Sequence, residues 1–326
     1  MSLLRVNELK TYFQIENERI PAVDDVSFYI DEGEVVAIVG ESGSGKSVTA
    51  LSIMGLVRSP GKIEGGEILF HGENLLQYKE KKMRGVRGNK ISMVYQEPMS
   101  SLNPMLSIGD QIAEVLIIHK RQSKAEAKKG AIKIMEAVGI SDSERRYKDY
   151  PAQFSGGMRQ RIIIAMAIVC NPELIIADEP TTALDVTVQA EILELLKRLI
   201  QETKMSLILI THDLGVVAEM ADRVYVMYCG KIMEESDKGD LFKNPRNPYT
   251  QGLIQCIPRI DDRADTLYTI GGNVPYATDF PKGCRFSTRC PKVMEKCREE
   301  LPPLIKVKDN HAVRCWLQED GHCEDN

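Results

Sequence analysis

The octapeptide Gly-Glu-Ser-Gly-Ser-Gly-Lys-Ser at residues 40–47 constrains the fold of this chain more than any other stretch. A largely apolar run of strand length, residues 34–39, precedes it, and residues 48–56 have the pattern of a helix. Glycines in such a loop let amide groups point inward, and the helix start adds the positive end of its dipole, which makes a concave anion site. The spacing predicts a phosphate-binding loop, in which Lys46 reaches the β- and γ-phosphates and the Ser47 hydroxyl binds Mg²⁺.

A phosphate loop alone does not distinguish kinases, GTPases, motors and transport ATPases, so the other strand ends matter. Residues 174–177 are apolar and are followed by Asp178 and Glu179, which predicts a buried strand with acidic groups at the edge where open α/β sheets bind ligands. Asp178 is suited to hold Mg²⁺ through water, and Glu179 to polarise a water for attack on the γ-phosphate. Gln96 and His212 also follow predicted strands, where they could touch Mg²⁺ or the γ-phosphate; taken singly, such residues are more often ordinary polar surface residues.

Between these strands the sequence changes to helix character. Apolar positions three and four apart predict helices over residues 108–120, 124–138 and 158–169. Just before the last of them, Ser155 to Gly157 could form a second anion-binding helix N-terminus, although such a sequence alone is more often only an N-cap. Residues 3–39 alternate apolar and polar positions instead, which predicts an antiparallel β region.

The composition limits the class of protein. A chain of 326 residues is long enough for about two domains. The formal net charge of −5 and the pI of about 5.7 give no electrostatic reason to expect a nucleic-acid partner. No apolar run approaches the length of a spanning helix and the first residues lack a signal-peptide pattern, so we expect a chain that neither crosses a membrane nor is exported.

Six motifs in one order, over about residues 3–235, make the chain resemble the nucleotide-binding subunit of an ABC transporter. They are the phosphate loop at Gly40 to Ser47, the Q-loop at Gln96, the signature at Phe154 to Met158, the Walker B strand at Leu174 to Glu179, the D-loop at Thr182 to Asp185, and the switch histidine His212. The resemblance implies an α/β P-loop NTPase fold, with a RecA-like core, an antiparallel β-subdomain and a helical insert. The signature departs from the usual Leu-Ser-Gly-Gly-Gln at its first and last positions, and Met158 replaces the glutamine that contacts the ribose.

The resemblance also assigns the site, with ATP and Mg²⁺ as cofactors. The residues expected to bind the nucleotide are Tyr12, Ser42, Gly43, Ser44, Gly45, Lys46, Ser47, Val48, Ser155, Gly156 and Gly157. Those expected to act in hydrolysis are Glu179 as general base, His212 and Gln96, and those expected to hold Mg²⁺ are Ser47, Gln96 and Asp178. Tyr12 fits the adenine-stacking position better than Phe13, although from the residues alone either ring could simply pack in the core.

The resemblance further implies an ATPase that drives transport. In this family ATP lies between the phosphate loop of one subunit and the signature of another, and the chain has one set of motifs, so a second ABC ATPase subunit, identical or related, is expected. Two integral membrane permease subunits and, indirectly, an extracellular peptide-binding protein are the other expected partners, with this chain peripheral at the cytoplasmic face of the membrane. The alternative is a non-transport ABC protein that acts on ribosomes or DNA, but such proteins usually carry two cassettes or long basic insertions.

The last 90 or so residues narrow the cargo. Residues 241–253 and 283–291 resemble the C-terminal extension of the oligopeptide/dipeptide (and nickel) importer ATPases, dipeptide-importer type, as far as about Leu317. The cargo is therefore expected to be di- or oligopeptides, with nickel chelates as the nearest relative. The expected division of the chain is residues 1–98 for the β-subdomain and first part of the core, 99–171 for the helical signature subdomain, 172–238 for the rest of the core, and 239–326 for a cysteine-rich extension.

Four cysteines in this last region are candidate ligands for one metal site. They are Cys284, Cys290, Cys297 and Cys315. Structural zinc prefers closer pairs, so the irregular spacing favours a [4Fe–4S] cluster, with zinc as the alternative and cysteines without metal as the third reading.

Overall fold

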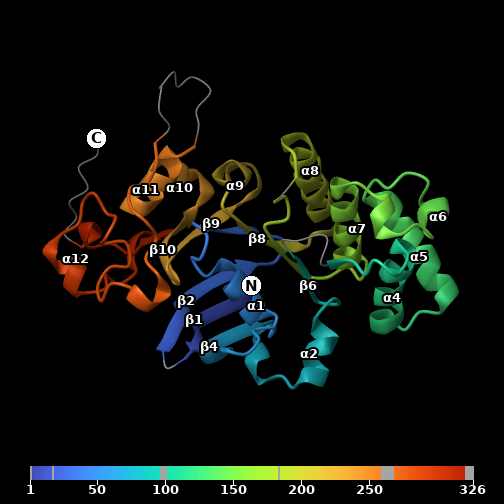
Figure 1. The fold of residues 1–326 in the computed structure, drawn as a ribbon, viewed down its shortest axis with the longest axis horizontal. Helices are drawn as coiled ribbons and strands as arrows, with labels where there is room; N and C mark the ends of the chain where they lie inside the picture. The colour runs from blue at the N-terminus through green and yellow to red at the C-terminus, as the bar shows by residue number, and fades with distance from the viewer. Residues whose placement is uncertain (1, 17, 96–100, 183, 258–267, 320–326) are drawn as a thin grey trace. The chain divides into compact units, whose positions relative to one another are not determined.

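In the computed structural model, residues 2–16, 18–95, 101–182, 184–257 and 268–319 are described (Figure 1). They form two compact units. Unit 1 contains residues 31–34 and 77–209, and unit 2 contains residues 2–30, 35–76 and the described residues from 210 onward. The C-terminal residues thus belong to the same unit as the phosphate loop. The predicted division into four regions cuts the chain differently and stays a prediction.

One sheet of unit 2 carries the phosphate loop at the end of β3. Its strands follow one another in the order β11 (Ile305–Lys308), β12 (His311–Val313), β10 (Lys231–Asp237), β9 (Arg223–Tyr228) and β3 (Val35–Val39). β3 and β9 are parallel, whereas β9, β10, β12 and β11 pair antiparallel in turn. Every residue of β3 and β9 is buried, which is why both read as nearly continuous apolar runs.

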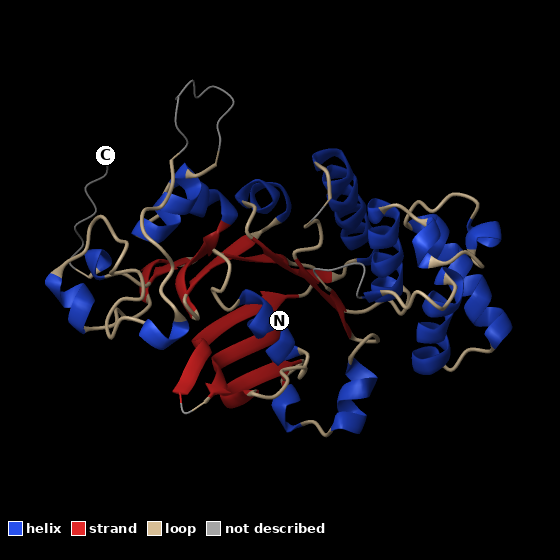
Figure 2. Ribbon diagram, in the orientation of Figure 1, coloured by secondary structure: helices blue, strands red, loops and turns tan. Residues whose placement is uncertain are grey.

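The second sheet of unit 2 accounts for the alternating pattern near the start of the chain (Figure 2). Its order is β2 (Glu18–Asp31), β1 (Ser2–Ile15), β4 (Gly61–Phe70) and β5 (Glu73–Asn74). β1 pairs antiparallel with β4, and β4 with β5. The helices of this unit are α1 (Lys46–Ile53), α9 (Leu214–Met220), α10 (Lys238–Lys243), α11 (Pro248–Gln255) and α12 (Glu295–Glu299).

The core of unit 2 joins residues that are far apart in the sequence. The rings of Tyr228, Tyr249 and Phe286 contact one another, with centroids 4.6 to 5.4 Å apart. Tyr228 ends β9, Tyr249 lies in α11 and Phe286 lies in the loop before α12. All three are buried in the cluster that also holds Ala37 and Val39 of β3. The C-terminal residues therefore pack directly on the strands that present the phosphate loop.

Unit 1 combines a few strands with most of the long helices. Its strands are β6 (Ile91–Val94), β7 (Leu174–Asp178) and β8 (Ser206–Thr211), in the order β8-β7-β6, with β6 and β7 parallel and the last two residues of β8 assigned to unit 2. Its helices are α2 (Glu80–Val86), α4 (Ile108–Lys120), α5 (Lys124–Ala137), α6 (Ser143–Arg146), α7 (Gly156–Ile168) and α8 (Val186–Thr203). Of the short 3₁₀ helices, Pro151–Gln153 belongs to unit 1, Ala277–Asp279 and Trp316–Gln318 belong to unit 2, and Leu75–Gln77 has residues in both.

Helix capping explains why the helical predictions were accurate. Ser107 caps α4, and Ser123 with Glu126 forms a capping box on α5, so both helices begin where the periodic pattern begins. α7 begins two residues before the predicted start because Ser155, not Gly157, is its N-cap.

No helix in the described ranges combines the length and the apolar character needed to span a membrane.

Candidate functional site

The phosphate loop in unit 2 has the backbone that its glycines predict. Gly40, Gly43 and Gly45 adopt φ values of 152°, 77° and 102°, a region that favours glycine. Gly45 is the N-cap of α1 and makes no side-chain capping bond. The loop therefore turns into a helix start whose first amide groups are not capped by a side chain, which is the arrangement that binds anions.

Lys46 lies across this loop. Its Nζ donates hydrogen bonds to the carbonyl oxygens of Gly40 (2.7 Å) and Glu41 (2.9 Å) and to Ser44 Oγ (3.3 Å). The residue is only 5% exposed. The ammonium charge is thus held over the concave side of the loop, where it would attract a bound polyphosphate.

The loop is also fixed from behind by unit 2. A Cβ at Gly40 would lie 2.1 Å from the carbonyl oxygen of Met227, and a Cβ at Gly45 would lie 2.3 Å from that of Ala22. Ser44 accepts a hydrogen bond from the amide of Gly230 at 2.9 Å. These close approaches to β2 and β9 leave no room for side chains at the two glycines.

Tyr12, the predicted adenine-stacking residue, lies in β1. Its hydroxyl donates to Asp24 Oδ1 at 3.1 Å, and burial together with the Asp24 charge raises the pKa of Tyr12. The Arg19 guanidinium lies 3.9 Å from the centre of the Tyr12 ring. One face of the ring is therefore covered by a side chain that is itself 55% exposed, and a base would need the other face or would displace Arg19.

In unit 1, the acidic end of β7 has an unusual backbone. Asp178 is 5% exposed at the last position of the strand. Glu179 follows with φ of 47°, a left-handed conformation that is rare outside glycine, and its Oε2 accepts a hydrogen bond from Thr182 Oγ1 at 2.9 Å. Strained backbone of this kind tends to occur where a side chain must be aimed for function.

The signature segment forms the start of α7. Ser155 caps the helix by accepting a hydrogen bond from the Met158 amide, and Ser155 and Gly156 are exposed. A Cβ on Gly157 would lie 2.4 Å from Val188 Cγ1 of α8. The small residues thus let α7 begin against α8 while its N-terminal edge stays open to solvent.

Two predicted site residues remain, His212 and Gln96. His212 follows β8 and is exposed in unit 2, next to Asp213, which caps α9. Gln96 lies outside the described residues, so its predicted role stays a prediction. The phosphate loop, Tyr12 and His212 belong to unit 2, whereas the Walker B strand and the signature belong to unit 1.

The predicted iron–sulfur or zinc site is wrong. Among the described residues, no group of three or more His, Cys, Asp or Glu side chains is arranged to hold a metal ion. The physical reason is that Cys284, Cys297 and Cys315 are buried and Cys290 packs against the same apolar core. Burial raises the pKa of Cys284 to about 11 and that of Cys315 to about 12, and it also raises the pKa of Cys290, which favours the neutral thiol and its packing as a small apolar group.

A set of polar contacts, which the sequence analysis did not predict, holds the loop and the region around Tyr12. Arg289 pairs with Glu41 of the phosphate loop, and the Glu41 amide donates to the Tyr249 hydroxyl. Arg285 and Lys231 both pair with Asp24, the partner of Tyr12. Because these contacts span up to 261 positions, no local pattern could have revealed them.

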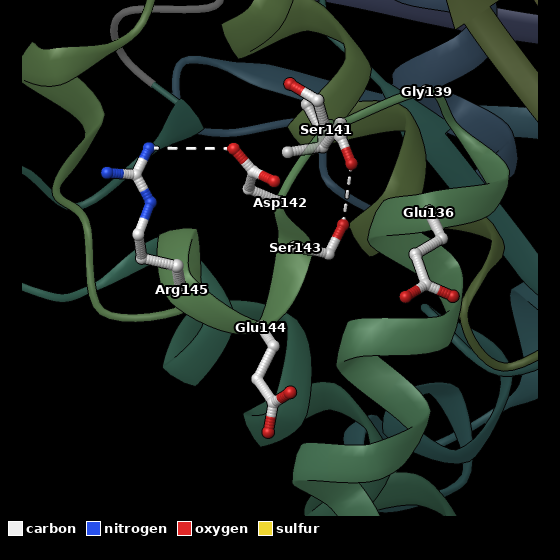
Figure 3. Close-up of a pocket in the computed structure, with 8 residues that line it drawn as sticks. Glu136, Gly139, Ser141, Asp142, Ser143, Glu144 and Arg145 are labelled. Carbon is white, nitrogen blue, oxygen red and sulfur yellow. Dashed lines mark hydrogen bonds and ion pairs between the residues drawn. The ribbon is translucent and has the colours of Figure 1, made fainter.

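A hollow in unit 1 contains none of the predicted nucleotide-site residues. It has a volume of about 940 Å³ and is lined by residues 136 and 139–145, between α5 and α6 (Figure 3). Two polar contacts join its lining residues: Ser143 Oγ donates to the Ile140 carbonyl at 2.7 Å, and Arg145 Nη2 lies 3.7 Å from Asp142 Oδ2. The hollow has no feature that relates it to phosphate chemistry.

Comparison with known proteins gives the family. The ABC transporter family matches residues 23–182, and the oligopeptide/dipeptide transporter C-terminal region matches residues 233–297. The chain is 55% identical to the oligopeptide transport ATP-binding protein AppD of Bacillus subtilis over 324 residues, 99% of each protein. It is 50% identical to the dipeptide transport ATP-binding protein DppD of the same bacterium over 318 residues, 97% of this chain and 95% of that protein.

Solved structures agree with this result. One solved structure is a dimeric ATP-binding cassette in a post-hydrolysis state, bound to ADP and Pi. Its chain is 30% identical in sequence to this one, with a TM-score of 0.65, and the match covers 72% of this chain and 98% of that chain. The likeness confirms the predicted P-loop NTPase fold of mixed α/β content, and the transporter C-terminal region argues against the alternative of a ribosome or DNA factor. The chain therefore belongs to the ABC transporter family, as an ATP-hydrolysing, ATP-binding subunit of the oligopeptide/dipeptide transporter kind.

Proposed function

We propose that this subunit binds MgATP on the phosphate loop of unit 2 and uses its hydrolysis to drive uptake of di- or oligopeptides through a membrane permease. The observation that carries the proposal is the loop itself, in which Lys46 is laid over a left-handed glycine turn at an uncapped helix start. Peptides are favoured as cargo because the relatives AppD and DppD are named for oligopeptide and dipeptide transport.

Within the site, each residue has a separate role. Lys46 and the loop amides take the β- and γ-phosphates, the Ser47 hydroxyl and Asp178 hold Mg²⁺, and Gln96 completes that set. Glu179 acts as the general base toward the attacking water, and His212 contacts the γ-phosphate. The backbone strain at Glu179 and its hydrogen bond from Thr182 support the first of these roles, because they fix the direction of the carboxylate.

The nucleotide site is completed by a second subunit. We propose that the open N-terminal edge of α7, with Ser155, Gly156 and Gly157, contacts the nucleotide of a partner ATPase of the same family. Support comes from the exposure of Ser155 and Gly156 and from the dimeric state of the similar solved cassette. In this proposal the antiparallel sheet of unit 2 is the β-subdomain of the cassette and α4 to α7 form its helical insert.

The assembly places the chain at the membrane. ATP-binding subunits of peptide importers work with membrane permease subunits, and we propose that two of these bind this ATPase pair at the cytoplasmic face. An extracellular peptide-binding protein delivers the cargo to them. ATP binding closes the pair and so shifts the permease between its conformations.

Replacing Glu179 by Gln tests the proposal. Because the amide cannot accept a proton, we expect steady-state ATP hydrolysis to fall by about a hundredfold or more while ATP binding is retained. The matched control is Glu194→Gln on the exposed face of α8, which makes the same chemical change away from the site and should leave hydrolysis unchanged. Unchanged hydrolysis in the Glu179→Gln protein would refute the assignment of the general base.

A further inference from the structure

We propose that Arg289 of the C-terminal region is a positioning residue for ATP binding: it neutralises and orients Glu41, so that the phosphate loop can accept a polyphosphate. The proposal rests on the loop being the nucleotide site, as argued above. Glu41 is the second residue of the loop and carries the carboxylate closest in sequence to the glycines that form the anion site.

The pairing of Arg289 with Glu41 is bidentate. Arg289 Nη1 lies 2.6 Å from Glu41 Oε2, and Nη2 lies 3.1 Å from Oε1. The Arg289 side chain is 3% exposed and that of Glu41 is 28% exposed, so solvent screens the pair weakly. A parallel two-bond pair of this kind fixes the carboxylate in direction as well as in charge.

All five N–H groups of Arg289 have acceptors. Besides the two bonds to Glu41, Nη1 donates to the Tyr228 hydroxyl (3.3 Å), Nη2 to the Ile270 carbonyl (3.2 Å) and Nε to the Gly271 carbonyl (3.0 Å). A guanidinium with every donor satisfied is held in one orientation. The hydrogen bonds with Glu41 raise the pKa of Arg289, so its positive charge is permanent.

The backbone of Glu41 is held by the same region. Its amide donates to the Tyr249 hydroxyl at 2.9 Å, and Tyr249 is fully buried against Tyr228 and Phe286. Tyr228, which contacts both Arg289 and Tyr249, links the two attachments. The second position of the loop is therefore fixed at its backbone and at its carboxylate by residues of the C-terminal region.

The negative charge of Glu41 explains why its pairing with Arg289 matters for ATP binding. A polyphosphate at the loop would meet the Glu41 carboxylate as a like charge unless that charge is compensated. Arg289 supplies the compensation from the side of the C-terminal core. By Coulomb's law, one uncompensated unit charge placed about 10 Å from a phosphate charge, at an effective dielectric constant of about 20, would change the affinity by roughly tenfold.

The test is equilibrium binding of a fluorescent ATP analogue to the full chain, together with steady-state hydrolysis. We expect Arg289→Gln to raise Kd and KM for ATP about tenfold with a small effect on kcat, and the defect to shrink with added salt. The double variant Glu41→Gln/Arg289→Gln should regain most of the affinity, because it removes the carboxylate that Arg289 compensates. Arg289→Lys should lie between Arg289→Gln and the wild type.

Two further variants separate this role from folding. Glu41→Gln alone should bind ATP at least as tightly as the wild type, and Arg298→Gln, which removes an exposed charge from α12, should behave as the wild type. A loss of affinity in Glu41→Gln equal to that in Arg289→Gln, or a double variant as weak as Arg289→Gln, would overturn the proposal in favour of a purely structural tie. Normal affinity in Arg289→Gln would overturn it as well, whereas retained ATP binding in Lys46→Ala would refute the nucleotide site itself.

Discussion

Two glycines of the phosphate loop differ in what their backbone requires. Gly43 and Gly45 both have positive φ, at 77° and 102°, so either would be strained as another residue. A Cβ on Gly43 would meet no atom within 4 Å, whereas a Cβ on Gly45 would lie 2.3 Å from the Ala22 carbonyl oxygen. The first position is thus limited by conformation alone and the second by conformation and space.

This difference predicts unequal effects of alanine substitution. We expect Gly43→Ala to destabilise the nucleotide-free protein by about 1–3 kcal/mol, the cost of a strained backbone, and Gly45→Ala to destabilise it by clearly more. Thermal unfolding of both variants without nucleotide measures the difference. Equal loss of stability in the two proteins would show that β2 moves away from Gly45 freely, contrary to the packing described.

The distance between partners along the chain decided which residues of the site could be predicted. The loop, the Walker B carboxylates and the signature each lie within a stretch of a few residues, so a role for each could be predicted from a local motif. The contact of Arg289 with Glu41 joins positions 248 apart, and both residue types are common on surfaces, so nothing in the sequence distinguishes this pair. The folded core around Tyr228 brings Arg289 and Glu41 into contact.

At the scale of elements, strands β10 and β12 are joined by a buried histidine. His311 is 2% exposed; its Nε2 lies 2.7 Å from Glu234 Oε1 and its Nδ1 lies 2.8 Å from Asp240 Oδ2. Burial alone would lower the pKa of His311, but the hydrogen bonds with Glu234 and Asp240 outweigh it and raise the pKa. Lys308 also contacts Asp240, at 3.0 Å. Imidazolium is therefore the form that the folded protein favours.

The raised pKa makes stability depend on pH in a defined direction. The stabilisation is fully present below the unfolded pKa of about 6.5 and is lost as the pH rises through the higher folded pKa. We expect urea unfolding to show that the wild type loses more stability than His311→Gln between pH 6 and pH 8.5. Parallel pH profiles of the two proteins would contradict the assignment, and His71→Gln serves as a control for a histidine outside this network.

Helices and central strands were predictable because their signals are local, but the way in which the C-terminal region packs was not. Its apolar residues are spaced irregularly and gain order by packing on β9 and β3. The crowding of cysteines there suggested a metal site, yet Cys284, Cys297 and Cys315 are buried as small core groups, and burial raises the pKa of Cys284 and Cys315. Cysteine spacing alone could not distinguish ligands from core residues, because both uses place thiols close together in space.

For the whole molecule, the exposed signature edge predicts assembly that depends on nucleotide. We expect the Glu179→Gln protein to be a monomer without ATP and a dimer with it, because hydrolysis no longer reopens the pair. Gly156→Glu should prevent the dimer, since Gly156 is exposed and its Cβ would make only an ordinary contact, 3.6 Å from Leu184 Cδ2. Light scattering after size-exclusion chromatography measures both states.

The control for this assembly is Gly239→Glu in α10, which adds the same charge at an exposed glycine with no atom within 4 Å of its Cβ. This variant should dimerise with ATP as the parent protein does. Dimerisation of the Gly156→Glu protein would place the contact elsewhere. Absence of a dimer in the Glu179→Gln parent would instead indicate that the partner subunit is a related chain rather than a second copy.

The pairing of Glu41 with Arg289 also has a consequence for biosynthesis. At about 5–20 residues per second, a ribosome that has made Glu41 needs about 12 to 50 s more to make Arg289, 248 positions later. Throughout that interval the nascent phosphate loop lacks both its compensating charge and the aromatic core behind it. A cell that makes this subunit therefore carries nascent chains whose nucleotide loop is complete in sequence but not in structure. If the ribosome released a chain near residue 240, that chain would lack Arg289 permanently.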